Sequence, residues 1–180
     1  MKIMNPIKKL ALVVGCGALA LGSGQVNLAD TLPASAAALR ANAGVTFVLT
    51  PTTDPSVFKI TVGGVVQASL IGNASEHAEV LVQFPTGPGQ PITLSGNVTL
   101  TSSDGANSLK FNVTGTATPD PANPAFFNNT YQATFTGGTG AFASATGAAQ
   151  ISETTKFTSP TTGTGTWTMK GYVVTPPSAN

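Results

Sequence analysis

Hydrophobic and polar residues alternate one by one along most of the chain after residue 44. Such a period of two places successive side chains on opposite faces of a β-strand. The runs with the clearest alternation cover residues 45–49, 58–62, 66–70, 78–84, 92–100, 109–113, 131–135 and 167–173. Thr, Ser and Asn fill most of the polar positions. The pattern predicts eight or nine antiparallel strands, each with one buried face and one hydroxyl-rich face.

Turn residues separate these runs, as in the segments Pro51–Pro55 and Pro85–Pro91. Gly63 and Gly64 are expected to break or bulge another run. Short links between successive strands favour a meander, and closing the meander would remove its exposed edges. We therefore predict an all-β fold, a single antiparallel barrel of about eight strands over residues 44–175. A two-sheet β-sandwich has the same periodicity and is the alternative.

The N-terminal residues 1–24 have the features of a signal peptide. Lys2, Lys8 and Lys9 precede an uncharged apolar run, Leu10–Gly22, which is shorter than the roughly 20 residues that span a bilayer. We expect the protein to be exported, and to be secreted, periplasmic or attached to the envelope. No other stretch is long and apolar enough to span, so we expect no transmembrane segment in the mature protein.

Cys16 leaves two interpretations of this segment open. Val13–Cys16 fits the loose bacterial lipobox pattern, in which the cysteine is acylated and becomes the mature N-terminus. Alternatively, Cys16 is one residue of an ordinary signal peptide, and the apolar residues that continue after it favour this interpretation. An Ala-rich linker is expected over residues 25–43, and a short tail over residues 176–180.

The few charged side chains limit the chemistry that can be expected. They make up 8% of the chain, against about 25% in typical globular proteins, and they form no basic patch, so nucleic acid is not an expected partner. His77 and Glu79 share one face of a strand and are the candidates for a metal or an acid–base pair. The chain has a single histidine, and two ligands do not complete a site. We therefore predict no metal site, no catalytic residue and no cofactor.

Aromatic residues are the candidates for contacts inside a barrel. Phe111, Phe135 and Trp167 each fall on the apolar face of their strand, where they would either line a ligand cavity or fill the barrel. In the last strand, Trp167 shares its face with Met169, whereas Thr168 lies on the opposite face. Trp167 is therefore predicted to be buried.

The C-terminal half resembles a group of secreted bacterial β-proteins of unknown function. The likeness spans residues 72–174 and is carried by the segments TFTGGTGAFASATGAAQIS, GTGTWTMKGYV and IGNASEHAEV. The GGTG-x-F-A step is also similar to that of allene oxide cyclase and dirigent proteins, which are small antiparallel barrels. The resemblance implies an eight-stranded barrel. Ala141 and Ser144 depart from the usual pattern, which commonly has Arg, Lys or Tyr at the first position and Gly at the second.

Three functions remain as hypotheses. The first is an exported, non-enzymatic barrel with a structural or small-ligand-binding role at the cell envelope or outside the cell, its ligand being a small apolar molecule. The second is an isomerase or cyclase similar to allene oxide cyclase, which would need a polar or charged residue in an apolar lumen; the faces assigned above offer no strong candidate. The third is an adhesive or carbohydrate-contacting module, for which Tyr172 is the best exposed aromatic candidate.

Overall fold

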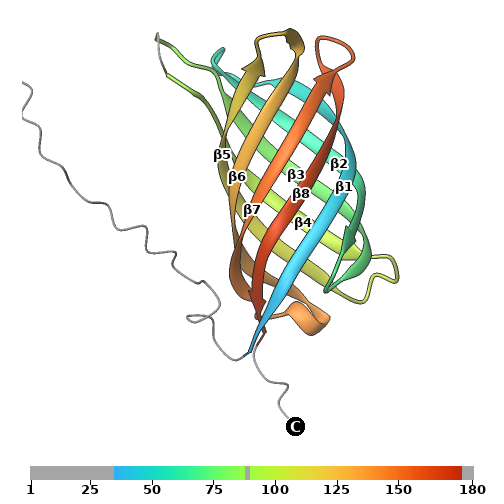
Figure 1. The fold of residues 1–180 in the computed structure, drawn as a ribbon. Coiled ribbons are helices and arrows are strands. Elements are labelled where there is room, and N and C mark those ends of the chain that lie inside the picture. The colour runs from blue at the N-terminus through green and yellow to red at the C-terminus, as the bar shows by residue number, and fades with distance from the viewer. Residues whose placement is uncertain (1–34, 88–89, 176–180) are drawn as a thin grey trace, which may run out of the picture. The chain divides into compact units, whose positions relative to one another are not determined.

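The computed structural model describes residues 35–87 and 90–175. The predicted signal peptide with Cys16, the first ten residues of the predicted linker and the predicted tail lie outside these residues. Within them, the chain forms one closed antiparallel barrel, which confirms the predicted fold and excludes the sandwich (Figure 1).

Eight strands build the barrel, and each pairs antiparallel with the next along the chain. Their bounds are β1 (Ala36–Pro51), β2 (Val57–Ala68), β3 (Gly72–Gln83), β4 (Ile92–Ser102), β5 (Ser108–Asp120), β6 (Asn123–Thr139), β7 (Thr146–Phe157) and β8 (Thr162–Val174). Pairing of β8 with β1 closes the sheet. A short 3-10 helix, η2 (Gly140–Phe142), lies between β6 and β7. Closure satisfies both edges of every strand, so the meander has no free edge.

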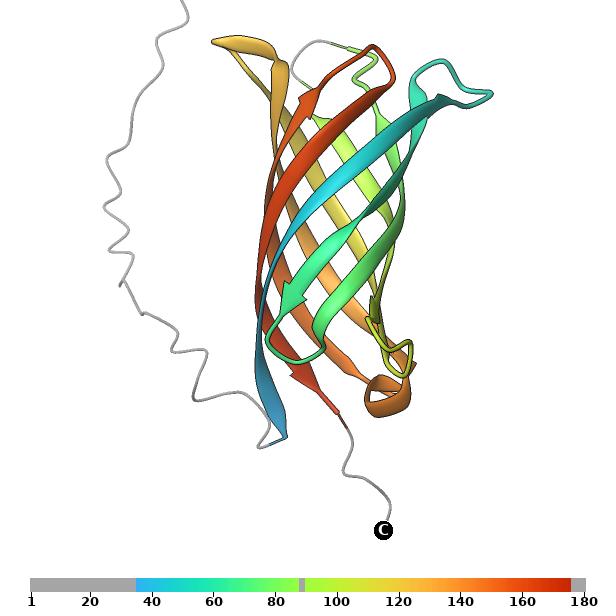
Figure 2. The same ribbon diagram turned by 90° about the vertical axis from the view of Figure 1, so that its right-hand side faces the viewer.

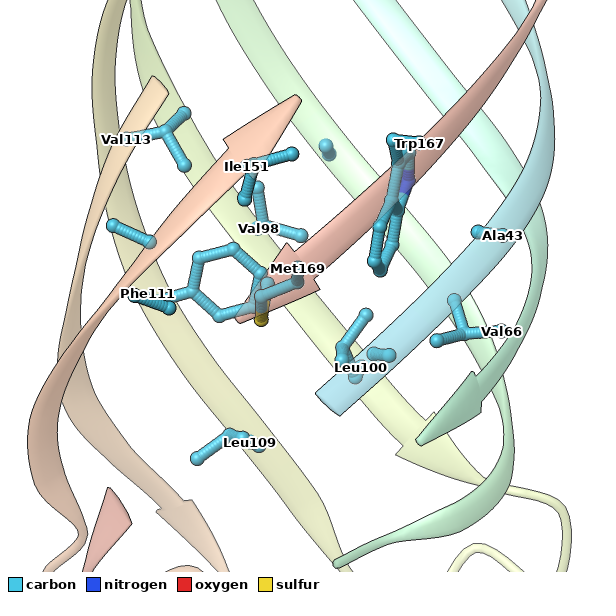
Figure 3. Packing of buried hydrophobic residues seen from close by; sticks show 14 of the residues in the cluster. Ala43, Val66, Val98, Leu100, Leu109, Phe111, Val113, Ile151, Trp167 and Met169 are labelled. Carbon is cyan, nitrogen blue, oxygen red and sulfur yellow. The ribbon is translucent and has the colours of Figure 1, made fainter. Parts of the chain in front are cut away.

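The alternating residues of the sequence face alternately the interior and the outer surface of the barrel. Buried and exposed residues alternate along most strands, and the buried set forms one apolar cluster within the barrel. In β8, Trp167, Met169 and Val173 are buried whereas Thr166 and Thr168 are exposed, as predicted. Figure 3 shows Trp167 and Met169 projecting into the interior from β8. Tyr172 is only partly exposed.

Two expected boundaries are corrected by the structure. Strand β1 begins at Ala36, so residues 36–43 belong to the barrel and not to a linker. Leu39 is buried there, and the segment pairs with the end of β8. Alanine is a poor strand former, and so an Ala-rich strand is easily mistaken for a linker. Gly63 and Gly64 do not break their run either, because β2 continues through both in unbroken register with β3.

The two ends of the barrel differ in how they are filled. Three connections, β2–β3, β4–β5 and β6–β7, lie at one end, which we call the closed end; it is the lower end in Figure 1 and carries η2 (Figure 2). Leu39, Leu100 and Leu109 are almost fully buried toward this end, and Phe142 of η2 packs against the same cluster. The other four connections lie at the opposite end, which we call the open end.

Candidate functional site

A cavity of about 90 Å³ occupies the half of the barrel nearer the open end. All eight strands contribute side chains to its wall. The wall is mainly aliphatic and aromatic, with Val80, Val98 and Ile151 among its buried members. Eight-stranded barrels are just wide enough either to be filled by side chains or to hold one small ligand. In this barrel, side chains fill the closed end, and a space remains in the half nearer the open end.

Partly exposed aromatic side chains surround the outer part of the cavity. Phe84, Phe127 and Phe157 line it close to the turns of the open end, and all three retain some exposure to solvent. Phe157 contacts Phe47 and Phe127 edge to face, with ring centroids 5.1 and 5.7 Å apart. The cavity therefore approaches the open end through an apolar aromatic rim.

Two glycines on the inward face of β8 leave room in the wall. A Cβ atom on Gly163 would lie 2.3 Å from the Phe47 ring, and one on Gly165 would lie 2.9 Å from Oε1 of Glu153. No side chain larger than hydrogen fits at Gly163 without displacing its neighbours. At Gly165, the absence of a side chain lets the Glu153 carboxyl lie close to the backbone of β8.

Glu153 is the centre of one polar group inside the barrel. Its Oε2 accepts a hydrogen bond from the Tyr131 hydroxyl at 2.8 Å and another from Nδ2 of Asn129 at 3.0 Å. Strand β6 supplies both donors, and they face the cavity beside Thr155 of β7. The carboxyl is thus held in place by two hydrogen bonds from the neighbouring strand.

Glu76 is the second carboxyl in the lumen. It lies on β3, far from Glu153 along the sheet, and its Oε2 accepts a hydrogen bond of 2.9 Å from Nε1 of Trp167 on β8. Strands β3 and β8 are not neighbours in the barrel, so this bond crosses the lumen. It orients the indole ring and the carboxyl relative to each other.

Both carboxyls have raised pKa values because they face an apolar interior. Burial raises the pKa of Glu76 to about 7; the Trp167 hydrogen bond opposes this, and the negative charge of Glu153 adds to it. Burial also raises the pKa of Glu153, against the hydrogen bonds from Asn129 and Tyr131. The pKa of Tyr131 lies well above its usual value, through burial first and the Glu153 charge second. Near neutral pH, the lumen therefore holds an acid that can exchange a proton.

Asn129 carries an unsatisfied acceptor in the same place. The residue is 7% exposed and lines the cavity, and its Oδ1 atom has no hydrogen-bond partner. Its Nδ2 atom is engaged with Glu153. Buried polar atoms without partners are uncommon in folded proteins, and each one calls for an explanation, such as a bound molecule.

The predicted aromatic candidates separate into two groups. Phe111 and Trp167 line the cavity. Phe135 is buried as well, but it lies outside the cavity wall and packs edge to face on Phe111, with ring centroids 5.4 Å apart. Phe135 therefore belongs to the filled part of the core.

His77 and Glu79 lie on the outer face of β3, where both are exposed. Glu79 accepts a hydrogen bond from Nζ of Lys59 at 3.2 Å, in an exposed ion pair of the kind that contributes little to stability. Within residues 35–87 and 90–175, no group of three or more His, Cys, Asp or Glu side chains is placed to hold a metal ion.

The faces assigned from the sequence offered no strong candidate for a charged residue in the lumen, and the structure corrects this. Glu76 and Glu153 both line the cavity, and the alternating runs identified in the sequence include neither residue. A signal was present, because Glu76 has the same parity as buried Ala78 and Val80, and Glu153 the same parity as buried Ile151. A carboxyl residue at a position that the alternation assigns to the inward, apolar face indicates a charged group in the lumen.

The chain matches no family model, no curated protein and no solved structure. The resemblance to the secreted β-proteins and to the allene oxide cyclase and dirigent barrels therefore stays a prediction. Among the residues that the structure describes, no helix has the length and apolar character needed to cross a membrane.

Proposed function

We propose that the protein is an exported binding protein that holds one small, largely apolar molecule in the open half of its barrel. The observation that carries this proposal is the cavity, because the same barrel packs its other half tightly. Binding sites for small molecules are typically apolar hollows with a few well-placed polar groups, and the lumen has both. Export is supported by the features of residues 1–24.

The size of the cavity limits the ligand. A cavity on the order of 150 Å³ accommodates a benzene molecule, and the space here is about 90 Å³. A slender molecule fits better than a bulky one, with part of its length between the aromatic side chains of the rim. A six-carbon chain with one polar end is a suitable probe.

Binding can be measured with 1-hexanol. The only tryptophan of the chain lines the cavity, so its fluorescence reports on the lumen without a label. We expect 1-hexanol to change this fluorescence in a saturable manner, and to shift the methyl NMR signals of Val80 and Val98 but not that of Leu109 in the closed end.

A variant that fills the cavity provides the control. Ala78→Leu adds a larger side chain to the wall and should abolish saturable binding, whereas His77→Leu adds the same side chain to the outside and should leave binding unchanged. If Ala78→Leu does not fold, Ala117→Leu fills the cavity from β5 instead. Equal binding by wild type and a folded, filled variant would refute the lumen as the site.

A second function is favoured by one observation, the presence of two carboxyls in the apolar lumen. A buried carboxyl whose pKa lies near neutrality can act as a general acid or base, which is the requirement of the isomerase hypothesis. Recovery of a bound compound in an altered form, lost in Glu76→Gln but not in Glu79→Gln, would favour catalysis over binding alone. The adhesive hypothesis stays a prediction.

A further inference from the structure

The hydrogen-bond donors beside the two lumen carboxyls are already engaged. Nε1 of Trp167 donates to Glu76, and the Tyr131 hydroxyl and Nδ2 of Asn129 both donate to Glu153. Each of these groups comes from a strand that packs directly on the cavity. A ligand that brings only acceptors would have to compete with the carboxyls for these donors.

The free atoms of the same cluster are acceptors. Among the residues that the structure describes, the hydrogen bonds to Glu76 and Glu153 all end on Oε2, so Oε1 of each carboxyl remains available. Oε1 of Glu153 lies close to Gly165, where a Cβ atom would come within 2.9 Å of it. Oδ1 of Asn129 is a third acceptor, which is buried and unpartnered on a residue that lines the cavity. Residues that line the lumen therefore carry three acceptor oxygens for which the described residues supply no donor.

We propose that the ligand of the lumen is a small aliphatic amine, bound as its ammonium ion, with its nitrogen at Glu76, Glu153 and Asn129 and its apolar chain toward the open end. This inference rests on the proposed binding function and specifies the class of ligand. An ammonium group has three N–H donors and no acceptor. It also carries a positive charge, which can pair with the negative charge of an ionised carboxyl in the apolar lumen. Buried charges in proteins are normally paired.

The arrangement of the barrel gives the amine a direction. The polar groups lie in the middle of the barrel, where Trp167 of β8 faces Glu76, and the partly exposed aromatic side chains lie beyond them near the turns. An amine would enter with its charged end first and leave its hydrocarbon chain among Phe84, Phe127 and Phe157. A carboxylate ligand would meet two carboxyls of its own charge.

The release or uptake of protons on binding distinguishes an amine ligand from a neutral one. The titratable groups that face the lumen are Glu76 from β3, Glu153 from β7 and Tyr131 from β6. The neighbours His77 and Glu79 are exposed on the outer face of β3. An ammonium ion favours the ionised form of both carboxyls, so amine binding should release protons near pH 7. A ketone would need a protonated carboxyl as its donor and should take protons up.

The experiment compares hexylamine, 1-hexanol and 2-hexanone on the full chain, by calorimetry in buffers of different ionisation enthalpy. We expect hexylamine to bind at least tenfold more tightly than either neutral probe at pH 7.5, with release of protons. Its affinity should fall at least tenfold per pH unit below the pKa of Glu76, because at least one proton must then leave for each amine bound.

Variants on one strand separate charge from packing. Glu76→Gln should weaken hexylamine at least tenfold and leave 1-hexanol within about twofold of wild type, whereas Glu79→Gln on the outer face of β3 should change neither. Should Glu76→Gln not fold, the proton release of the wild-type protein still decides the matter. Tighter binding of 2-hexanone with proton uptake would overturn the amine, and saturable binding of no probe would refute the proposed function itself.

Discussion

Replacing Trp167 with alanine should lower the free energy of unfolding by roughly 3–5 kcal/mol, the cost typical of removing a buried aromatic side chain. The side chain is 5% exposed and belongs to the apolar cluster of the interior. Its loss leaves a larger cavity and also removes the N–H donor of Glu76. Because whole domains are stable by only about 5–15 kcal/mol, we expect a large fall in the urea midpoint. Far-UV circular dichroism measures it without tryptophan fluorescence.

The matched control is the neighbouring residue of β8. Thr168 is exposed on the outer face, so Thr168→Ala should change the free energy of unfolding by no more than about 0.5 kcal/mol. A third variant, Trp167→Phe, keeps an aromatic ring but no N–H donor, and it should fall between the other two. Greater damage from Thr168→Ala than from Trp167→Ala would contradict the assignment of faces in this strand.

Stability should also depend on pH through Glu76. Its pKa is about 7 in the folded protein and 4.5 as the reference for an unfolded chain. Between these values, the folded protein binds the proton more tightly than the unfolded chain does. The contribution of this group is therefore fully present below pH 4.5 and is lost as the pH rises through 7. The loss amounts to about 3 kcal/mol, from the difference between the two pKa values.

Urea unfolding between pH 4.5 and 8.5 measures this loss. Glu76→Gln should flatten the profile and be more stable than wild type at pH 8.5, because an uncharged amide replaces a buried carboxylate. Glu79→Gln removes a carboxylate from the exposed face of the same strand and should keep the wild-type slope. Glu153 has a raised pKa as well, so part of the slope should remain in Glu76→Gln. A slope identical in wild type and Glu76→Gln would show that the carboxyl does not titrate in the lumen.

Two hydrogen-bonded aspartates should affect the pH dependence of stability only below this pH range. Hydrogen bonds from Ser56 lower the pKa of Asp54, and those from Ser102 and Ala106 lower the pKa of Asp104. A lowered pKa gives a contribution that is present above the unfolded value of 3.8 and is lost as the pH falls further. A second decrease in stability below pH 3.8 would therefore be assigned to these turns and not to the lumen.

The class of fold followed from the sequence because strand alternation is a local property. Each residue points opposite to its neighbours whatever the strand is paired with, and so the inward position of Trp167 and the outward position of Thr168 were predictable one strand at a time. The same rule places Glu76 on the side of Ala78, although the cluster of charges around Glu76 hid this. The boundary at Ala36 was missed because alanine gives a weak strand signal.

Only the tertiary structure decided what the inward faces enclose. Glu76 and Glu153 lie on β3 and β7, and nothing local relates them; they share one space because β8 pairs with β1 and closes the sheet. The difference between the filled end and the hollow end likewise depends on which side chains meet across the lumen. At the closed end, Phe142 of η2 is one of the side chains that fill the interior. The sequence by itself determined most of the strands and the faces of their residues, because those depend on neighbouring residues. The site was decided by closure, which brings residues from non-adjacent strands together.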